Sequence, residues 1–274
     1  MPEVERELDS RGVQYRVLRT ETLEQGVSEA RRAAGGGEVP VVMSGDGLVG
    51  AIGGALAQSG AALGIIPGGR GNDLARVLGI PNDPAGAVAV LAGGNEREID
   101  VGEANGRRFL CVASTGFDSE CNRLANETQL IKGNLVYAYA AIRTLASWKP
   151  AAFTVVLDDG EPVQFTGYSV AVANSRAFGG GMFIAPHAQL DDGLLDVITI
   201  SDVSKLRYAR GLPKVFKGTH LENEEVSERR AATIEISADR DFAVYADGEH
   251  LTDLPATITT MKRALRVIAP SEPA

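Results

Sequence analysis

Residues 40–50 read Pro-Val-Val-Met-Ser-Gly-Asp-Gly-Leu-Val-Gly. The apolar run that opens this stretch is too short for a helix. It ends in Ser-Gly-Asp-Gly, ahead of a segment of small and apolar residues over 48–56. This order predicts a buried strand, a tight glycine turn and a helix. Because backbone N–H groups and a helix N-terminus converge at such a turn, it suits an anionic phosphate.

Asp46 lies inside this turn, where its carboxylate would repel a bare phosphate. A divalent cation between the carboxylate and the phosphate would explain it. A plain helix cap explains Asp46 equally well. Taken alone, the loop fits both roles.

A second loop repeats the pattern. Residues 63–66 form another short apolar run, and residues 67–76 read Pro-Gly-Gly-Arg-Gly-Asn-Asp-Leu-Ala-Arg. This again predicts a strand, a glycine turn and a helix, now with Arg70 and Asp73 in the turn. Loops that follow successive strands of a parallel sheet lie side by side at its carboxyl edge, where ligands bind. The sequence therefore predicts one ligand site built from both loops.

The pair of loops resembles the GGDGT and PxGTxNDxAR signatures of the diacylglycerol kinase/sphingosine kinase superfamily of lipid kinases, and the resemblance extends over nearly the whole chain. It implies an ATP site and a bound Mg²⁺. The residues implied at the ATP site are Gly45, Asp46, Gly47, Gly69, Arg70, Asn72 and Asp73. Asp46 and Asp73 would reach the Mg²⁺ largely through water. The Gly-Gly-Gly over 179–181 resembles a family loop near the same cleft.

Two further acids match positions of the family that are linked to magnesium. Asp100, in Ile-Asp-Val-Gly over 99–102, matches a third acidic position of the ATP-site network. Asp192, followed by Gly193, matches a structural magnesium site. Local explanations stay open for both, since Asp100 also fits a strand-end residue bonded to nearby amides and Asp192 fits a β-turn.

The chain departs from the family pattern at two positions. Leu48 and Arg70 stand where the family has threonine, so two hydroxyl donors to phosphate are missing. Arg70 can compensate by gripping phosphate bidentately. Alternatively, Arg70 forms a salt bridge with Asp46 or Asp73 and closes an inactive site. We favour the phosphate-binding role.

The candidate catalytic acids lie in Tyr-Ala-Asp-Gly-Glu over 245–249. A strand followed by Asp-Gly indicates a hairpin turn. Resemblance to the family's Asp-Gly-Glu motif implies that Asp247 is the general base for a lipid hydroxyl. Glu249, two residues on, is expected on the same face of the strand as a supporting carboxylate.

The fold class expected is an α/β domain with a parallel sheet, followed by an antiparallel β-sandwich. Strand and helix alternate over 1–98, including a short strand at 13–18. Over 99–270 short strands dominate, with helices only at about 117–126, 134–147 and 204–217. The family's first strand, which ends in Asn-Pro-x-Ser-Gly, is lacking here. We therefore expect either a start further upstream or exposed apolar faces that favour a homodimer.

Composition and charge narrow the partners. The formal net charge of −9 argues against non-specific nucleic-acid binding. No apolar run approaches the ~20 residues of a membrane span. Residues 205–220 contain no acid, and Arg207, Arg210, Lys214 and Lys217 recur at helical spacing. We expect a cytoplasmic protein that touches an anionic membrane surface transiently through this stretch.

These observations together favour an ATP-dependent lipid kinase that phosphorylates a hydroxyl of diacylglycerol or a related lipid. One alternative is a catalytically impaired homologue that binds lipid or regulates. Another is an enzyme like NAD kinase, which shares the first glycine loop. The Gly-Asn-Asp of the second loop and the Asp-Gly-Glu motif favour the lipid branch.

Overall fold

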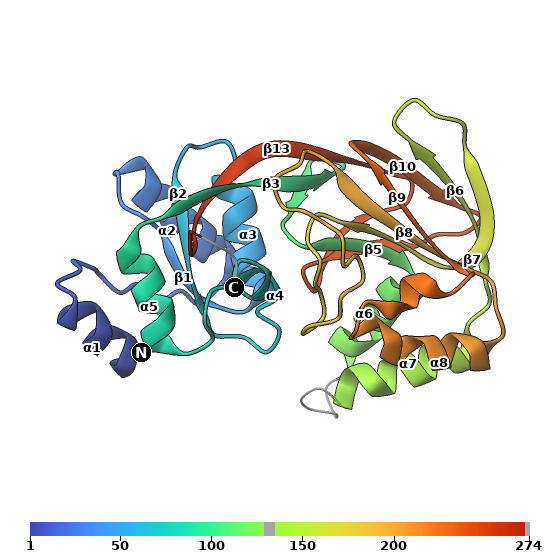
Figure 1. Cartoon of the computed structure of the whole chain (residues 1–274), viewed down its shortest axis with the longest axis horizontal. Helices are drawn as coiled ribbons and strands as arrows, with labels where there is room; N and C mark the ends of the chain where they lie inside the picture. The colour runs from blue at the N-terminus through green and yellow to red at the C-terminus, as the bar shows by residue number, and fades with distance from the viewer. Residues whose placement is uncertain (129–134, 272–274) are drawn as a thin grey trace.

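A computed structural model describes residues 1–128 and 135–271. Figure 1 shows two halves: helices surround a small sheet in one half, and a larger, strand-rich body with helices along one side forms the other. The long strands β3 (Glu96–Ala104) and β13 (Ala256–Ile268) run through both halves and join them.

The N-terminal half alternates helix and strand. Its elements are α1 (Pro2–Ser10), α2 (Leu23–Gly35), β1 (Val41–Ser44), α3 (Asp46–Leu56), β2 (Ala62–Pro67), α4 (Asp73–Val77) and α5 (Pro84–Gly93). Strand β1 pairs with β2 in parallel, and β2 pairs in parallel with the end of β13, where Val267 lies opposite Leu63. The third strand of this sheet therefore comes from the far end of the chain.

The C-terminal half is built mainly of antiparallel strands. Beside β3 and β13 it contains β4 (Arg107–Phe109), β5 (Val112–Gly116), α6 (Phe117–Glu127), α7 (Leu135–Ser147), β6 (Ala151–Leu157), β7 (Val163–Ala173), β8 (Leu195–Ser201), α8 (Lys205–Val215), the 3₁₀ helix η1 (Thr219–Glu222), β9 (Val226–Ala231), β10 (Thr233–Ala238), β11 (Ala243–Ala246) and β12 (Glu249–Asp253). Strands β10, β6, β7, β5, β11 and β12 follow one another in antiparallel order.

The expected fold class is confirmed: a parallel α/β unit is followed by an antiparallel β-sandwich-like unit. Two buried cores support the fold, and the first of them continues from the N-terminal half into the C-terminal half, where it includes Ala171 and Ile184. Leu63 and Ile99 belong to this first core, while Phe153 and Trp148 belong to an aromatic core within the sandwich. The domain boundary near residue 98 stays a prediction, since β13 returns from the sandwich to the first sheet.

The strand predicted at 13–18 is wrong. These residues form neither helix nor strand, and the side chains of Tyr15, Val17 and Leu18 are exposed. A strand needs a neighbour to satisfy its backbone groups and an apolar face to bury. This segment has the alternating composition but finds no such surface.

An apolar face lies at the edge of the first sheet. Within the described residues β1 pairs only with β2. Val41 is 47% exposed and Met43 is 41% exposed. Further exposed apolar side chains of the N-terminal half are Tyr15, Val17, Leu18, Leu23 and Val39.

None of the helices in the described part of the chain has the length and apolar character needed to cross a membrane.

Candidate functional site

The two glycine loops touch where their backbones cross. Gly45 precedes α3, and Gly69 lies in the loop after β2. A Cβ added to Gly69 would overlap the Cα of Gly45, and one added to Gly45 would lie 3.1 Å from the Cα of Gly69. Only glycine permits this approach, so the two loops form one continuous surface at the N-terminus of α3.

Asp46 fastens the two loops together. It begins α3, and its carboxylate accepts a hydrogen bond from the Asn72 N–H at 2.9 Å and another from the Asp73 N–H at 2.6 Å. Each carboxylate oxygen keeps further lone-pair capacity after accepting one bond. The side chain is half-buried, so it holds the loop and can still accept another partner.

Asp73 extends this chain of contacts into the C-terminal half. Its carboxylate accepts the N–H groups of Gly180 at 2.9 Å and Gly181 at 2.8 Å. Burial raises the pKa of Asp73, and the nearby charge of Asp46 raises it further. The second loop is therefore tied to the Gly-Gly-Gly segment over 179–181.

Arg76 was missed in the sequence analysis. Its guanidinium donates to the Gly71 carbonyl at 3.3 Å and lies beside Gly181, 3.6 Å from the position of an added Cβ. It therefore braces the same two loops that Asp73 connects. The signal for it was present, because Arg76 closes the second family signature.

Asp247 lies in a two-residue turn between β11 and β12. Asp247 and Gly248 have φ values of 52° and 88°, which fits the turn geometry preferred in tight hairpins. The Asp247 carboxylate accepts the N–H groups of Leu110 at 2.9 Å and Cys111 at 3.0 Å. These two bonds fix the direction of the carboxylate.

The hairpin packs directly against α3. A Cβ added to Gly50 would lie 2.7 Å from the Asp247 Oδ2, and one added to Gly47 would lie 3.6 Å from the Glu249 Oε1. The chain thus brings Asp247 and Glu249 to the same helix end that carries Asp46. This packing explains why α3 has glycine on the face that receives the hairpin.

The expectation that Glu249 shares a strand face with Asp247 is wrong. Strand β11 ends at Ala246, and Glu249 begins β12 on the other side of the turn. Two-residue periodicity applies only within one strand. The two acids come together because both sides of the turn face α3.

Burial raises the pKa of Asp247 to about 6, and the charge of Asp46 contributes in the same direction. The bonds from Leu110 and Cys111 oppose this rise. A carboxylate with this pKa is charged at neutral pH, and it is a stronger base than an exposed aspartate.

Asp100 and Asp192 have local partners. Asp100 is fully buried and accepts the N–H groups of Gly193 and Arg263, both at 2.6 Å. Asp192 accepts the Leu194 N–H at 2.9 Å and forms an ion pair with Arg230. Over residues 1–128 and 135–271, no three His, Cys, Asp or Glu side chains gather to hold a metal ion. A magnesium role for either acid stays a prediction.

The two departures from the family signature have separate explanations. Leu48 packs toward α2, with its Cδ1 3.1 Å from the position of a Cβ on Gly26, and so it serves the core. Arg70 is exposed and has no ion pair within the described residues. The salt bridge from Arg70 to Asp46 or Asp73 that would close the site is not formed.

Two family models match successive parts of the chain. Residues 1–104 match the family described as diacylglycerol kinase catalytic domain, and residues 111–269 match the YegS C-terminal NAD kinase beta sandwich-like domain. The chain is 37% identical over 247 residues to a diacylglycerol kinase of Mycobacterium tuberculosis, covering 88% of this chain and 80% of that protein. A diacylglycerol kinase of Staphylococcus aureus is 28% identical over 283 residues, covering 99% and 87%.

Solved structures share the fold. A diacylglycerol kinase from Bacillus anthracis str. Sterne superposes with a TM-score of 0.77 at 21% identity, covering 100% of this chain and 90% of that one. An NAD kinase from Archaeoglobus fulgidus in complex with ATP gives a TM-score of 0.54 at 14% identity, covering 98% and 89%. At these identities the likeness concerns the fold alone.

The contacts of Asp73 give a first prediction. Asp73→Asn replaces one acceptor oxygen by an NH₂ group that faces a backbone N–H of Gly180 or Gly181. We expect the free energy of unfolding to fall by about 1–3 kcal/mol, because a buried hydrogen bond is lost. Amide exchange at Gly180 and Gly181 should also become faster. Urea unfolding and hydrogen exchange measure the two effects.

The matched control is Asp239→Asn, on an exposed turn, which should change stability by less than about 0.5 kcal/mol. Unchanged exchange at Gly180 and Gly181 in the Asp73→Asn variant would mean that Asp73 does not hold this loop.

Proposed function

The chain belongs to the diacylglycerol kinase family, and on that premise we propose that it transfers the γ-phosphoryl group of ATP to a hydroxyl of diacylglycerol or a related lipid. The observation that carries the proposal is the meeting of the Asp247 hairpin with the crossed glycine loops at the N-terminus of α3. A phosphoryl transfer needs phosphates held and an acceptor hydroxyl deprotonated beside them. These groups supply both functions in one place.

The phosphates of ATP would bind on the crossed loops. Gly45 caps α3 without a side-chain hydrogen bond, so the first N–H groups of that helix are available to an anion. Gly45, Gly47 and Gly69 leave room for close approach to the backbone. The exposed guanidinium of Arg70 would grip a phosphate bidentately, in place of the family threonine.

The residues at the loops also fit Mg²⁺. Asp46 has spare lone pairs and is half-buried beside the phosphate surface, with Asp73 and Asn72 next to it. Magnesium usually takes one or two carboxylates, substrate phosphates and water, so it needs no cage of three protein ligands. When bound there, the ion would neutralise charge on the phosphates.

Asp247 would take the proton of the lipid hydroxyl. The hydroxyl oxygen then forms its bond to the γ-phosphorus, the bond from that phosphorus to the bridging oxygen breaks, and ADP leaves. The amides of Leu110 and Cys111 hold the Asp247 carboxylate in position for this transfer. Glu249 begins β12 on the other side of the same turn, and it would support the site from its position beside Gly47 of α3.

A catalytically impaired homologue is not favoured. That alternative requires Leu48 and Arg70 to disable the phosphate site. Leu48 packs toward α2, and Arg70 has no ion pair among the described residues. The likeness to an NAD kinase is one of fold, whereas the relatives at 37% and 28% identity carry the name diacylglycerol kinase.

The pKa of Asp247 gives a second prediction. A general base works only when deprotonated, so kcat/KM should fall as the pH drops below about 6 and level off above it. Asp247→Asn should lower kcat by roughly 10²–10⁴-fold and abolish this inflection. Transfer of labelled phosphate from Mg²⁺–ATP to diacylglycerol in detergent, followed over pH, measures both effects.

Asn at this position also places an NH₂ group against the N–H of Leu110 or Cys111, so folding must be checked by thermal unfolding and ATP binding by calorimetry. Glu249→Gln is the matched control and should keep the inflection near pH 6. Normal turnover in a folded Asp247→Asn variant would remove Asp247 from the role of base.

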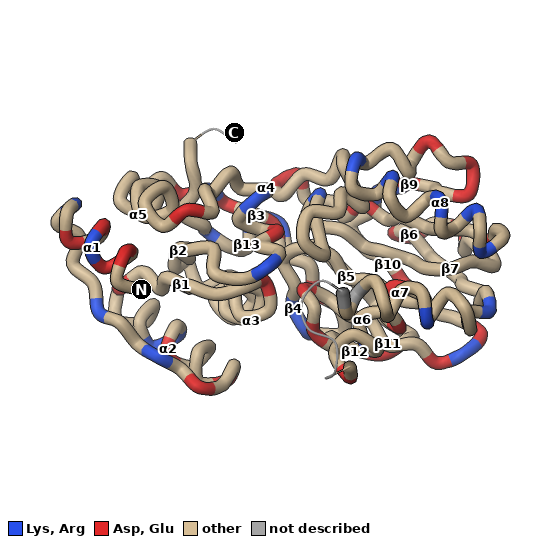
Figure 2. Tube along the Cα trace, turned by 90° about the horizontal axis from the view of Figure 1, so that it is seen from below, with Lys and Arg blue, Asp and Glu red and all other residues tan. Residues whose placement is uncertain are grey.

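We also propose that α8 touches the membrane that holds the lipid. Figure 2 shows its run of cations, and Leu206 and Phe216 beside them are 61% and 56% exposed. Arg207 is bonded to Glu225 at 2.7 Å, and Lys214 to Asn223 at 2.5 Å. Two of the four cations of the expected basic face, Arg207 and Lys214, therefore already have partners within the protein. Arg210 and Lys217, which have no ion pair in the described residues, are left for lipid headgroups.

A third prediction follows for this surface. Arg210→Gln with Lys217→Gln should weaken binding to liposomes of anionic phospholipid by roughly thirtyfold, because each of the two cations near such a surface contributes about 1 kcal/mol. Turnover on detergent-solubilised lipid should stay unchanged. Arg19→Gln with Arg31→Gln, in the N-terminal half, removes the same charge as a control. If both double variants lost liposome binding equally, the binding would come from general electrostatic attraction and not from α8.

The apolar edge at β1 supports a homodimer as a further proposal. A second copy would cover Val41 and Met43 and satisfy the outer backbone groups of β1. We predict that Val41→Lys with Met43→Lys shifts the protein toward monomer in sedimentation velocity, since lysine on an edge strand opposes pairing. A parent protein that is already monomeric at high concentration would contradict this.

A further inference from the structure

A pocket of about 510 Å³ lies between α6, α7 and the turn that precedes β11. Its volume falls in the range of small-molecule sites. None of its lining residues belongs to the crossed glycine loops or to the Asp247–Gly248 turn. We call it the α6–α7 pocket.

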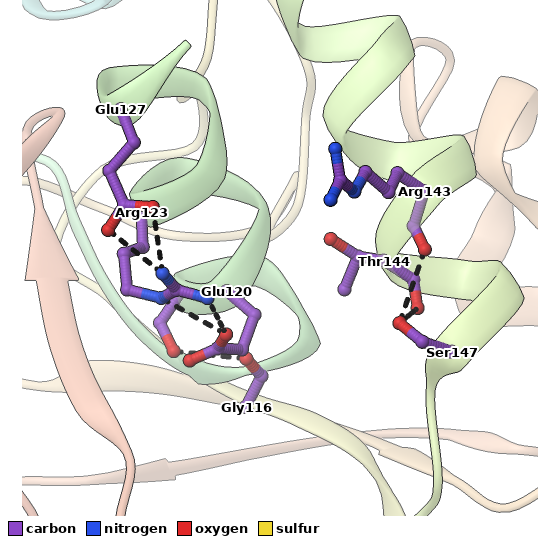
Figure 3. A network of polar contacts seen from close by, with 8 residues as sticks. Gly116, Glu120, Arg123, Glu127, Arg143, Thr144 and Ser147 are labelled. Carbon is purple, nitrogen blue, oxygen red and sulfur yellow. Dashed lines mark hydrogen bonds and ion pairs between the residues drawn. The ribbon is translucent and has the colours of Figure 1, made fainter.

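The α6 wall of the α6–α7 pocket contains two glutamates, Glu120 and Glu127, that share one cation, Arg123, so this wall keeps one net negative charge. Arg123 donates to Glu120 and to Glu127, both at 2.8 Å (Figure 3). These ion pairs join neighbouring turns of one helix and hold all three side chains against it. The two glutamates are thus already engaged by a cation of their own helix.

The opposite wall carries cations that lack such partners. Arg143, Lys149 and Arg240 line the pocket, and in the part of the chain that the structure describes none of them forms an ion pair with a carboxylate. Asp241 is the remaining acid of the lining. The far wall therefore has an excess of positive charge.

Two of these cations are held in place. Figure 3 shows the Arg143 side chain reaching from α7 toward α6, and its Nη1 donates to the Tyr139 hydroxyl at 2.6 Å. The Arg240 guanidinium lies 5.2 Å from the Trp148 ring centre and 4.9 Å from that of Phe242. Stacking on aromatic rings stabilises a guanidinium and reduces the ordering needed when a ligand binds.

We propose that the α6–α7 pocket binds a phosphate group, with Arg143, Lys149 and Arg240 as its donors. Guanidinium groups recognise phosphate bidentately, and a lysine adds a mobile point charge. The phosphate that these three cations would bind could belong to the headgroup of an anionic phospholipid or to a soluble phosphate ester.

The test compares the parent protein with Arg143→Gln/Arg240→Gln. The probes are phosphatidylcholine vesicles with and without phosphatidylglycerol, and sn-glycerol 3-phosphate in calorimetry. We expect the double variant to bind its phosphate ligand roughly tenfold or more weakly, because charge-assisted hydrogen bonds are lost. The control Arg19→Gln/Arg31→Gln should change binding by less than about twofold. The readout is binding without turnover, so it does not depend on kinase activity.

Each outcome decides the proposal. If the double variant binds sn-glycerol 3-phosphate more weakly than the parent, the ligand is a soluble phosphate ester. If only its binding to phosphatidylglycerol vesicles is weaker, the ligand is a lipid headgroup. Equal binding by parent and variant, or an equal loss in the control, overturns it. Because Arg240 stacks on Trp148, thermal unfolding must show a folded variant. Lys149→Gln, at an exposed position without such stacking, provides a second test and should also weaken binding.

Discussion

The Asp46 carboxylate, shared between the N–H groups of Asn72 and Asp73, is the interaction on which the candidate site depends. It fixes the second glycine loop against the first turn of α3. Asp73, oriented by this contact, then accepts Gly180 and Gly181 from the other half of the chain. A carboxylate that accepts two backbone N–H groups satisfies donors that no helix or strand employs, and bonds to a charged acceptor are among the stronger ones. Loops with few apolar side chains acquire a defined shape in this way.

A second carboxylate near the C-terminal end of the chain also accepts two backbone N–H groups, and its turn packs closely against a helix backbone. Asp247 accepts two neighbouring amides as Asp46 does, and the glycines of α3 let its turn pack against the helix. Strand β13 holds the Asp247 turn and α3 in this relative position, because it pairs with β3 along both halves and with β2 at its end. The hairpin and the glycine loops are therefore held by one continuous sheet rather than by a loose contact between two bodies.

Sequence reasoning succeeded where the signal is local. Two short apolar runs, each ending in glycines, were enough to predict β1, β2 and the helices after them. It failed at residues 13–18, where a strand-like composition meets no partner strand. It also failed for Glu249, because periodicity within a strand says nothing about a turn that interrupts it. The packing of Asp247 on Gly50 joins residues almost two hundred positions apart, and no single-sequence pattern carries such a contact. The α6–α7 pocket was missed for the same reason, since Arg240 reaches it from a distant turn.

The gathering of acids at a phosphate site poses a problem of charge. The charge of Asp46 raises the pKa of both Asp73 and Asp247, so the three carboxylates interact, and a nucleotide would add further negative charge. Backbone N–H groups offset part of this repulsion at each carboxylate, but they are already used in holding the loops. In the proposed function the balance is restored from outside the protein by a divalent cation and from within by the exposed Arg70. In the proposed function this arrangement would favour nucleotide that arrives together with its metal ion, since a nucleotide without the ion would meet three carboxylates of like charge.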